Sequence, residues 1–501
     1  MSSRPLLRHR ILQWWRGLPD RKRDFALNIM IGSLISVLLA PAETTVAVSS
    51  LRDKMLTWQI SQFAGTDIGA SLAFIDIDDQ THVASWGSPY YTPRDKLCRL
   101  IDYSAHAGAR VIVVDIDLSA RSQSQTQRHA LTCDSNTPQD ERATPPASAD
   151  DALASYLRRY DAKCPTAGSR EGCPPIILTR GLRTSRTDAL PNGTPAHEPQ
   201  PSFLDPIGQE SNSVAFGTAI FHVDADSMIR GWRLWEPVCQ SLRGRALPSA
   251  EMLAVAAYNG KDLVKLQRAL DVGLAPQCLQ TGEQSTAEQG TPEHAAAGLN
   301  AHAQMPRDNF IIDVGYPLEL STSDLERRFF YRFGWAPPGA QRQKGQRLGV
   351  VVPAWEITDV EPSQRFNPAL LRGKIVVIGG TYSDNPDVHQ TPLGEMPGTV
   401  VLLNAINALL HDDHIREAPW YLRYGIDAFL TIFVSVLFFY LPHRAALVSA
   451  SLIIVAAAVT GGYLLLNRGY FFDPIMPILG IQVHELVGGI ETWLHQRGVL
   501  K

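Results

Sequence analysis

The chain has 501 residues, more than one hydrophobic core usually organises, so two folded units or one domain with long insertions are expected. Its 46 basic and 50 acidic residues give a formal net charge of -4. This balance leaves no broad basic face to neutralise phosphates and excludes nucleic acid as a partner. The apolar residues gather near the two ends, whereas the middle of the chain is polar and globular in character.

The first 24 residues are basic and precede an apolar run. Residues 25–42 are about 18 mainly apolar residues, which at about 1.5 Å per residue just reach across a hydrocarbon core of about 30 Å. The basic residues predict that 1–24 stay in the cytoplasm and that the following chain begins outside it. A second interpretation is a cleaved signal peptide, because Ala40, Pro41 and Ala42 resemble a signal-peptidase site. Both interpretations place the middle region outside the cytoplasm.

The region 43–419 has the pattern of an α/β domain. Residues 71–78 form a short apolar run that ends in acids and predicts a buried strand. Residues 93–108 follow as a helix, with a proline in its first turn and a glycine at its end. Residues 110–117 predict the next strand, so the three elements form a right-handed parallel crossover.

Later segments extend this pattern. Strands are expected at residues 175–180, 309–314 and 374–379, and helices at 248–258 and 398–411. Two polar stretches, near 119–174 and 277–307, interrupt the order and predict surface insertions. The predicted fold class is therefore α/β, with a mainly parallel sheet and flanking helices.

All six cysteines lie in the region predicted to be outside the cytoplasm, which indicates an oxidising environment and disulfide bonds. The connectivity does not follow from the sequence, because six cysteines allow many pairings. We favour a bridge between Cys239 and Cys278. The earlier four are then expected to form two bridges among themselves: Cys98, Cys133, Cys164 and Cys173. A zinc site is the alternative, but no Cys-x-x-Cys or Cys/His spacing supports it.

Three apolar segments follow this region and predict further membrane helices. They are residues 422–441, 445–466 and 470–490. The chain would then have one α-helical span before the outer domain and three after it, in a bacterial inner membrane, with the domain in the periplasm and the tail 491–501 in the cytoplasm. His484 and Glu485 lie in the last segment. They could form a contact between helices or part of a proton path, and we favour the contact.

Six aspartates at or near the ends of predicted strands form the candidate binding site. They are Asp76, Asp78, Asp79, Asp115, Asp117 and Asp384. Because adjacent parallel strands end at one edge of the sheet, where open α/β sheets bind ligands, we expect these carboxylates to converge there. Such a group favours a divalent cation or the cationic group of a small ligand. The alternative is structural: the acids cap the following helices or pair with Arg94 and Arg230.

No motif supports catalysis. The sequence lacks a phosphate-binding loop, a nucleophile elbow, a zinc-protease motif and a dinucleotide-binding fingerprint in a suitable strand-to-helix context. We therefore expect no enzyme activity and no cofactor.

A series of short motifs occurs along the chain in a fixed order. They are residues 74–79, Gly87, Pro93 with Arg94, 107–117, 215–217, 224–230, 371–379, Asp384, 391–393 and Pro397 with Gly398. Together they resemble the type-two CHASE domain, an extracytoplasmic sensory module of bacterial cyclases and kinases, across about residues 25–496. One departure concerns the family's His-Ala-Asn after the Pro-Gly pair, because this chain has Leu402, Leu403 and Asn404.

The resemblance implies a sensory function and the same plan of one span before and three after the domain. Relatives commonly continue into a cytoplasmic cyclase or kinase, and no such domain follows residue 490 in this sequence. We therefore expect a separate protein partner that receives the signal, with the lipid bilayer and a second copy of the chain as further partners. The alternative function is a non-switching membrane scaffold or an accessory subunit of an envelope assembly.

Overall fold

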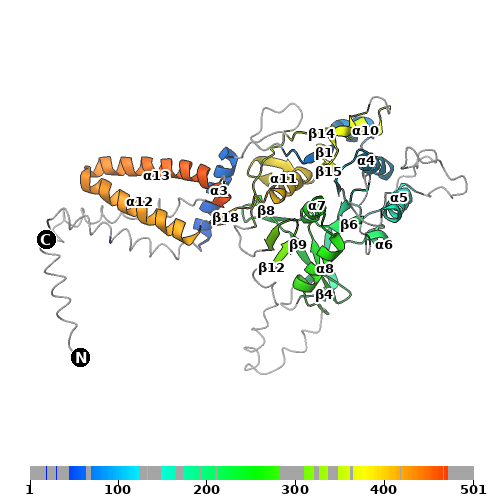
Figure 1. Cartoon of the computed structure of the whole chain (residues 1–501), viewed down its shortest axis with the longest axis horizontal. Helices are drawn as coiled ribbons and strands as arrows, with labels where there is room; N and C mark the ends of the chain where they lie inside the picture. The colour runs from blue at the N-terminus through cyan, green and yellow to red at the C-terminus, as the bar shows by residue number, and fades with distance from the viewer. Residues whose placement is uncertain are drawn as a thin grey trace, which may run out of the picture. The chain divides into compact units, whose positions relative to one another are not determined.

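Two compact units make up the chain in the computed structural model (Figure 1). Residues 64–414 form the α/β unit, and residues 1–63 with 415–501 form the helical unit. The structure describes residues 45–63, 69–122, 148–164, 173–190, 195–208, 213–280, 310–320, 327–336, 348–361, 365–417, 419–466 and 468–471, together with 19, 30, 133 and 211.

A six-stranded sheet lies at the centre of the α/β unit. Its order is β14-β1-β15-β2-β3-β6, and each neighbouring pair is parallel. The strands are β1 (Leu72–Ile77), β2 (Val111–Asp115), β3 (Ile176–Thr179), β6 (Val214–Gly217), β14 (Val351–Pro353) and β15 (Ile375–Gly380). Their apolar, β-branched runs are typical of strands covered on both faces. The predicted α/β fold with a mainly parallel sheet is confirmed.

Helices cover both faces of this sheet (Figure 1). They are α4 (Arg94–His106), α5 (Ala149–Lys163), α7 (Ala250–Tyr258) and α11 (Gly398–Leu410). Alternate strand residues such as Ile75 and Ile112 form one buried core with Leu97 of α4 and Leu153 of α5. The other face packs against α7 and α11, which approach the strands at Gly217 and Gly379.

The structure corrects three details of the predicted elements. Strand β15 lies between β1 and β2, which the sequence had placed side by side. The strand predicted at 309–314 is β12 (Phe310–Asp313), which pairs only with β13 (Pro317–Leu320) in an antiparallel hairpin. Its Ile311 is 60% exposed, as in a strand covered on one face.

The third correction concerns the stretch 119–174, predicted as a surface insertion. It contains α5, which begins where Ser148 Oγ accepts a hydrogen bond from the backbone N–H of Asp151 at 3.1 Å. The apolar side of α5 is buried in the core with α4, so this part of the stretch belongs to the fold. Most of the other predicted insertion, 277–307, lies outside the described residues.

A second sheet of five strands was not predicted. Its order is β10-β9-β5-β4-β11, and β5 and β9 form its parallel pair. These strands are β4 (Leu182–Ala189), β5 (Pro195–Pro199), β9 (Trp235–Gln240), β10 (Arg243–Pro248) and β11 (Leu279–Gln280). The remaining elements used below are η2 (Gln80–Ser85), β7 (Phe221–Val223), β8 (Ile229–Trp232), α8 (Leu263–Leu274), β16 (Val388–Thr391) and β17 (Gly394–Pro397).

The helical unit contains α3 (Val46–Phe63), α12 (Trp420–Tyr440) and α13 (His443–Leu466). The last two helices cover most of the segments predicted as spans at 422–441 and 445–466. Within the described ranges, no helix combines the length and the apolar character needed to cross a membrane. The other predicted spans, 25–42 and 470–490, lie outside the described residues except for Met30, Tyr470 and Phe471.

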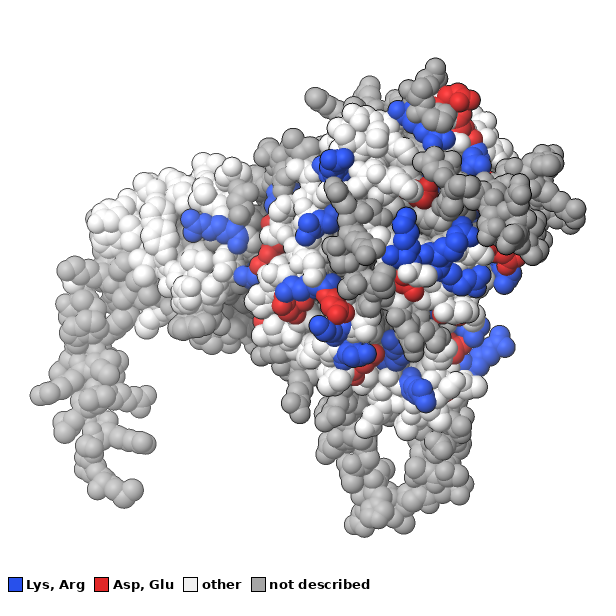
Figure 2. Space-filling view, turned by 45° about the vertical axis from the view of Figure 1, so that its right-hand side comes forward, with Lys and Arg blue, Asp and Glu red and all other residues white. Residues whose placement is uncertain are grey.

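Large apolar side chains are exposed along α12 and α13. Phe429 is 64% exposed and Leu452 is 65% exposed, and Ile432, Val448 and Val455 are each more than half exposed. Figure 2 shows few charged side chains on this part of the surface, whereas the α/β unit carries many.

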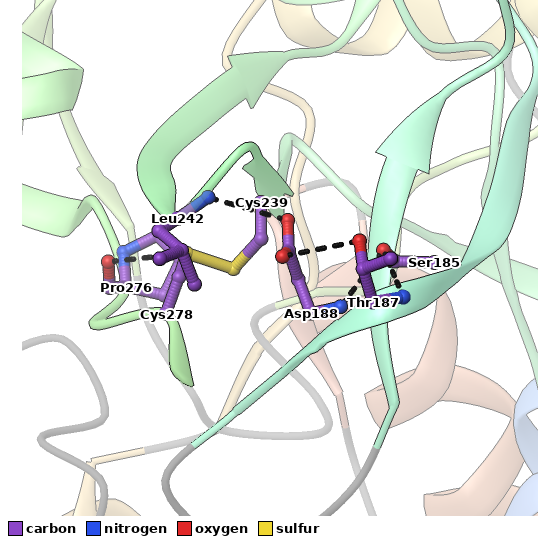
Figure 3. The surroundings of a disulfide bond; sticks show 7 residues. All are labelled: Ser185, Thr187, Asp188, Cys239, Leu242, Pro276 and Cys278. Carbon is purple, nitrogen blue, oxygen red and sulfur yellow. Dashed lines mark hydrogen bonds between the residues drawn. A yellow bond between two sulfur atoms is a disulfide. The ribbon is translucent and has the colours of Figure 1, made fainter. Parts of the chain in front are cut away.

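Three disulfide bonds join the cysteines of the α/β unit. They are Cys98–Cys133, Cys164–Cys173 and Cys239–Cys278, which confirms the favoured pairing. The third bridge ties β9 to the segment that follows α8 (Figure 3). Beside it, Asp188 of β4 accepts a hydrogen bond from the backbone N–H of Leu242 at 3.4 Å, so covalent and polar contacts hold this end of the second sheet.

Asn404 of α11 fixes the segment 329–333 beside the helix. Its Oδ1 accepts hydrogen bonds from the backbone N–H groups of Arg332 at 2.7 Å and Phe333 at 2.8 Å. Its Nδ2 donates to the carbonyl oxygens of Phe333 at 3.0 Å and Val400 at 2.9 Å. Because the side chain is fully buried, these bonds replace the hydrogen bonds that its amide group would make with water.

We expect Asn404→Leu to lower the free energy of unfolding by about 2–4 kcal/mol, because two backbone N–H groups lose their acceptor. Asn407→Leu is the matched control on the same helix. Asn407 is also fully buried, but neither amide atom has a hydrogen-bond partner within the described residues, so its replacement should leave stability unchanged or raise it. Denaturant midpoints measure both variants, and a larger loss for Asn407→Leu would contradict this assignment.

Candidate functional site

Five residues form a row across the carboxyl edge of the six-stranded sheet. Asp76 pairs with Gly379 and Gly379 with Asp115, while Thr179 pairs with Gly217. The register of β2 with β3 places Thr179 beside Asp115. The preceding residue of each strand packs in or against the core with α4 and α5, so alternation turns this row toward α7 and α11. Two strand spacings place the Asp76 and Asp115 backbones about 10 Å apart.

The two glycines of the row allow helix N-termini to approach the sheet. A Cβ atom at Gly379 would lie 2.3 Å from Thr399 Oγ1 in the first turn of α11. A Cβ atom at Gly217 would lie 2.8 Å from the backbone N of Ala250, the first residue of α7. No side chain fits at either distance, so the positive ends of two helix dipoles are held against the row.

Asp115 lies beneath the first turn of α11. Its Oδ2 accepts a hydrogen bond from Thr399 Oγ1 at 2.7 Å. Burial raises the pKa of Asp115. The charge of Asp387 adds to the rise and the hydrogen bond from Thr399 opposes it, and the resulting pKa is about 6. Asp387 itself pairs with His389 at 2.7 Å on the exposed rim of the site. Asp115 therefore ionises in mildly acidic solution.

Asp76, at 5% exposure, accepts a 2.7 Å hydrogen bond from Thr381 Oγ1 in the loop after β15. Burial raises the pKa of Asp76 from 3.8 to about 7, with added rises from Asp78 and Asp79. This shift corresponds to about 4 kcal/mol, whereas a helix N-terminus typically stabilises an anion by about 0.3–1 kcal/mol. Burial therefore outweighs the helix dipole, and Asp76 keeps its proton until near neutral pH.

Two of the predicted acids have local structural roles. Asp78 Oδ1 accepts hydrogen bonds from the backbone N–H of Thr81 at 2.8 Å and from its hydroxyl at 2.6 Å, in the first turn of η2. Asp117 Oδ1 accepts a bond from the backbone N–H of Ser119 at 2.8 Å and so closes a turn after β2. For these two residues the contacts are those of the structural alternative.

Asp79 and Asp384 lie at the loop after β15. Ser383 donates hydrogen bonds to Asp79 from its backbone N–H and from its hydroxyl, each at 2.7 Å. His82 stacks on Tyr382 with ring centroids 3.9 Å apart. Burial lowers the pKa of His82, and the nearby charge of Asp384 opposes this. Asp78 and Asp79 raise the pKa of Asp76, and Asp79 and Asp384 both act on His82, so these acids lie on the β1 side of β15, whereas Asp115 lies across that strand.

The arginines considered as partners of these acids form their ion pairs with other residues, although Arg94 Nη2 also donates a 3.2 Å hydrogen bond to the backbone oxygen of Asp117. Arg94 points to the α4 and α5 side of the sheet, where its Nε lies 3.5 Å from Asp150. Arg230 of β8 binds Asp224 and Asp226, each at 2.6 Å. Neither arginine has an ion pair with Asp76 or Asp115 among the pairs formed by the described residues.

Glu251, which was not predicted, lies beside Asp115. It is the only acid in α7, it is fully buried, and neither carboxyl oxygen has a hydrogen-bond partner within the described residues. Burial raises the pKa of Glu251 and the charge of Asp115 adds to the rise, so that the resulting pKa is about 8. The site therefore combines three buried or partly buried acids, Asp76, Asp115 and Glu251, that ionise at different pH.

Comparisons with known proteins give one match. A family model, the CHASE2 domain, matches residues 29–441, most of the chain. The curated proteins and the solved structures contain no match to it. Within the described ranges, no group of three or more His, Cys, Asp or Glu side chains is placed to hold a metal ion.

We expect Gly379→Ala to lower the free energy of unfolding by about 1–3 kcal/mol, because the new Cβ overpacks the first turn of α11 and breaks the bond from Thr399 to Asp115. Gly425→Ala in α12 is the control. Among the described residues, none outside the neighbouring backbone of α12 lies within 4 Å of a Cβ at that position, and alanine favours a helix by about 1 kcal/mol. Thermal unfolding measures the stability of both variants. Equal losses of stability would contradict the close approach of α11 to Gly379.

Proposed function

Because this chain belongs to the CHASE2 domain family, a family of extracellular sensory domains, we propose that its α/β unit receives a signal outside the cytoplasm and passes it to a separate protein partner. The three disulfide bonds support this compartment, since disulfides persist in oxidising environments. The proposal assigns no catalytic step to the chain.

In this proposal the signal is received at the carboxyl edge of the six-stranded sheet. This assignment is based on the row of residues in which Asp76 and Asp115 lie on either side of Gly379, the residue of β15 that α11 covers. Open α/β sheets bind their ligands at this edge. The cationic group of a small ligand would displace the proton that Asp76 holds near neutral pH. The net charge at Asp76 then stays the same, and a larger group beside α11 takes the place of the proton.

A ligand carries a signal only if it binds two arrangements of the domain with different affinity. Helix α11 is the element best placed to differ between them. It contacts the site through Thr399 and holds the segment 329–333 through Asn404. The chain then continues from Leu410 and re-enters the helical unit at residue 415.

We further propose that the helical unit attaches the chain to the bacterial inner membrane. The exposed apolar side chains of α12 and α13 support this proposal, because each Å² of apolar surface left in water costs about 25 cal/mol. The apolar run at 25–42 gives the same support from the other end of the chain. Resistance of the chain to extraction from membranes by alkaline washing tests the attachment.

The ligand proposal is tested on the full chain in detergent with a panel of small amines and amino acids. We expect at least one compound to raise the melting temperature, since a ligand at about 100 times its Kd adds about 2.7 kcal/mol to stability. Asp76→Asn should abolish the shift, because the variant lacks the charge that receives the cationic group.

Asp78→Asn is the control two residues along, since asparagine also accepts the bonds that Thr81 donates. Loss of the Asp78 charge lowers the pKa of Asp76 and leaves more of its carboxylate for the cation, so this variant should keep or strengthen the shift. If no compound shifts the melting temperature, or if both variants respond alike, a non-switching scaffold replaces the sensor. Crosslinking in membranes then identifies the partner: a cyclase or kinase supports the sensor, and an envelope complex supports the scaffold.

A further inference from the structure

Glu251 occupies a position where burial outweighs the groups that favour an ionised carboxylate. It is the second residue of α7, after the cap at Ser249, and its side chain is fully buried. Neither Oε1 nor Oε2 has a hydrogen-bond partner of good geometry within the described residues, and the nearby Ser249 hydroxyl and the backbone N–H of Glu251 offset only part of the effect of burial on its pKa. A buried carboxylate without adequate partners is so costly that the group takes up a proton instead.

The neighbour of Glu251 is a second acid with a different environment. Asp115 accepts the hydrogen bond from Thr399, which favours its ionised form and offsets part of the effect of its burial. Glu251 accepts no comparable bond within the described residues. The two groups therefore ionise in sequence: Asp115 loses its proton first, with a pKa of about 6, and its charge then helps to raise the pKa of Glu251 to about 8.

The elements packed against α7 supply no cation to this pair. Strands β3 and β6 and helix α11 contain no titratable residue, and β2 contributes Asp115 itself. On α8, Lys265 and Arg268 are exposed, and Asp271 is partly exposed. On the rim beyond Asp115, His389 is already paired with Asp387. At the far end of α7 lies Tyr258, and Arg180, just after β3, pairs with Asp205 at 2.6 Å.

We propose that Glu251 and Asp115 form a proton-binding site, so that the domain responds to the proton concentration outside the cytoplasm. This inference rests on the proposed sensory function and names the proton as a ligand of the same edge. Near neutral pH the pair holds one proton. When the O–H bond of Glu251 breaks, the proton passes to solvent and two negative charges remain between α7, α11 and the sheet. Repulsion between them favours an arrangement in which the start of α7 moves away from the edge or water enters.

Infrared spectroscopy of the full chain detects the proton directly, through the C=O stretching band of a protonated carboxylic acid. In the difference between the natural chain and Glu251→Gln, we expect this band at pH 7 and its loss with a midpoint near pH 8. The difference isolates Glu251 from Asp76 and Glu236, whose pKa values burial raises to about 7. Glu319→Gln, at an exposed position of β13, is the control and should give no such band.

A second variant keeps the test decisive if Glu251→Gln folds poorly. Asp115→Asn removes the charge that raises the pKa of Glu251, so the midpoint should move downward in that variant. A midpoint that stays in place, or the absence of the band at pH 7 in the natural chain, would overturn the proposal.

The pH dependence of unfolding gives an independent prediction. Between an unfolded pKa of 4.5 and a folded pKa of about 8, Glu251 holds a proton only in the folded state, so stability falls as pH rises through this window. From pH 6 to 7 the folding equilibrium constant of the natural chain should fall about tenfold relative to that of Glu251→Gln, and above pH 7 the fall becomes less steep as Glu251 ionises. Parallel curves would contradict it.

The proton proposal and the proposed function fail in different ways. If Glu251→Gln titrates like the natural chain while Asp76→Asn loses its response to amines, the proton site is removed and the sensor remains. If the infrared band follows the prediction but no compound shifts the melting temperature and both Asp76→Asn and Asp78→Asn behave alike, the proton site remains and the amine site is removed.

Discussion

The close approach of α11 to β15 at Gly379 is the constraint on which the rest of the site depends. Because glycine has no side chain, Thr399 reaches the strand and binds Asp115, and the first turn of the helix covers the edge between two acids. Any larger residue would hold the helix away and let water reach Asp76 and Asp115. Their carboxyl groups would then ionise at ordinary pH, and the edge would lose its response near neutrality.

The sequence predicted the elements of this arrangement better than their order. The apolar runs of β1, β2, β3 and β15 and the caps of their helices are local signals, and each led to the correct element type. Periodicity does not say which strands are neighbours, so β15, which is distant in sequence, was not placed between β1 and β2. The second sheet was missed because strands such as Leu182–Ala189 are polar and lack an apolar pattern.

The sequence predicted the direction of those acidic side chains that lie within a strand. Asp76 and Asp115 lie inside β1 and β2, so alternation fixes their direction. Asp78 and Asp117 come after the strands end, where alternation no longer applies, and they bind turns instead. Glu251 escaped prediction because an acid in the first turn of a helix usually faces water and stabilises the dipole. Only the packing of α7 against the sheet reveals that it is buried.

Family membership and structure together describe a sensory domain whose ligand edge contains acids that keep their protons to unusually high pH. Family membership gives the sensory role and the extracellular side, and burial gives the chemistry. In this description Glu251 is protonated beside an ionised Asp115 at neutral pH. Neutron diffraction from deuterium-exchanged crystals at pH 7 tests it most directly. We expect a deuteron on the carboxyl group of Glu251 and none on Asp115, and a Glu251 carboxylate without a deuteron would contradict this assignment.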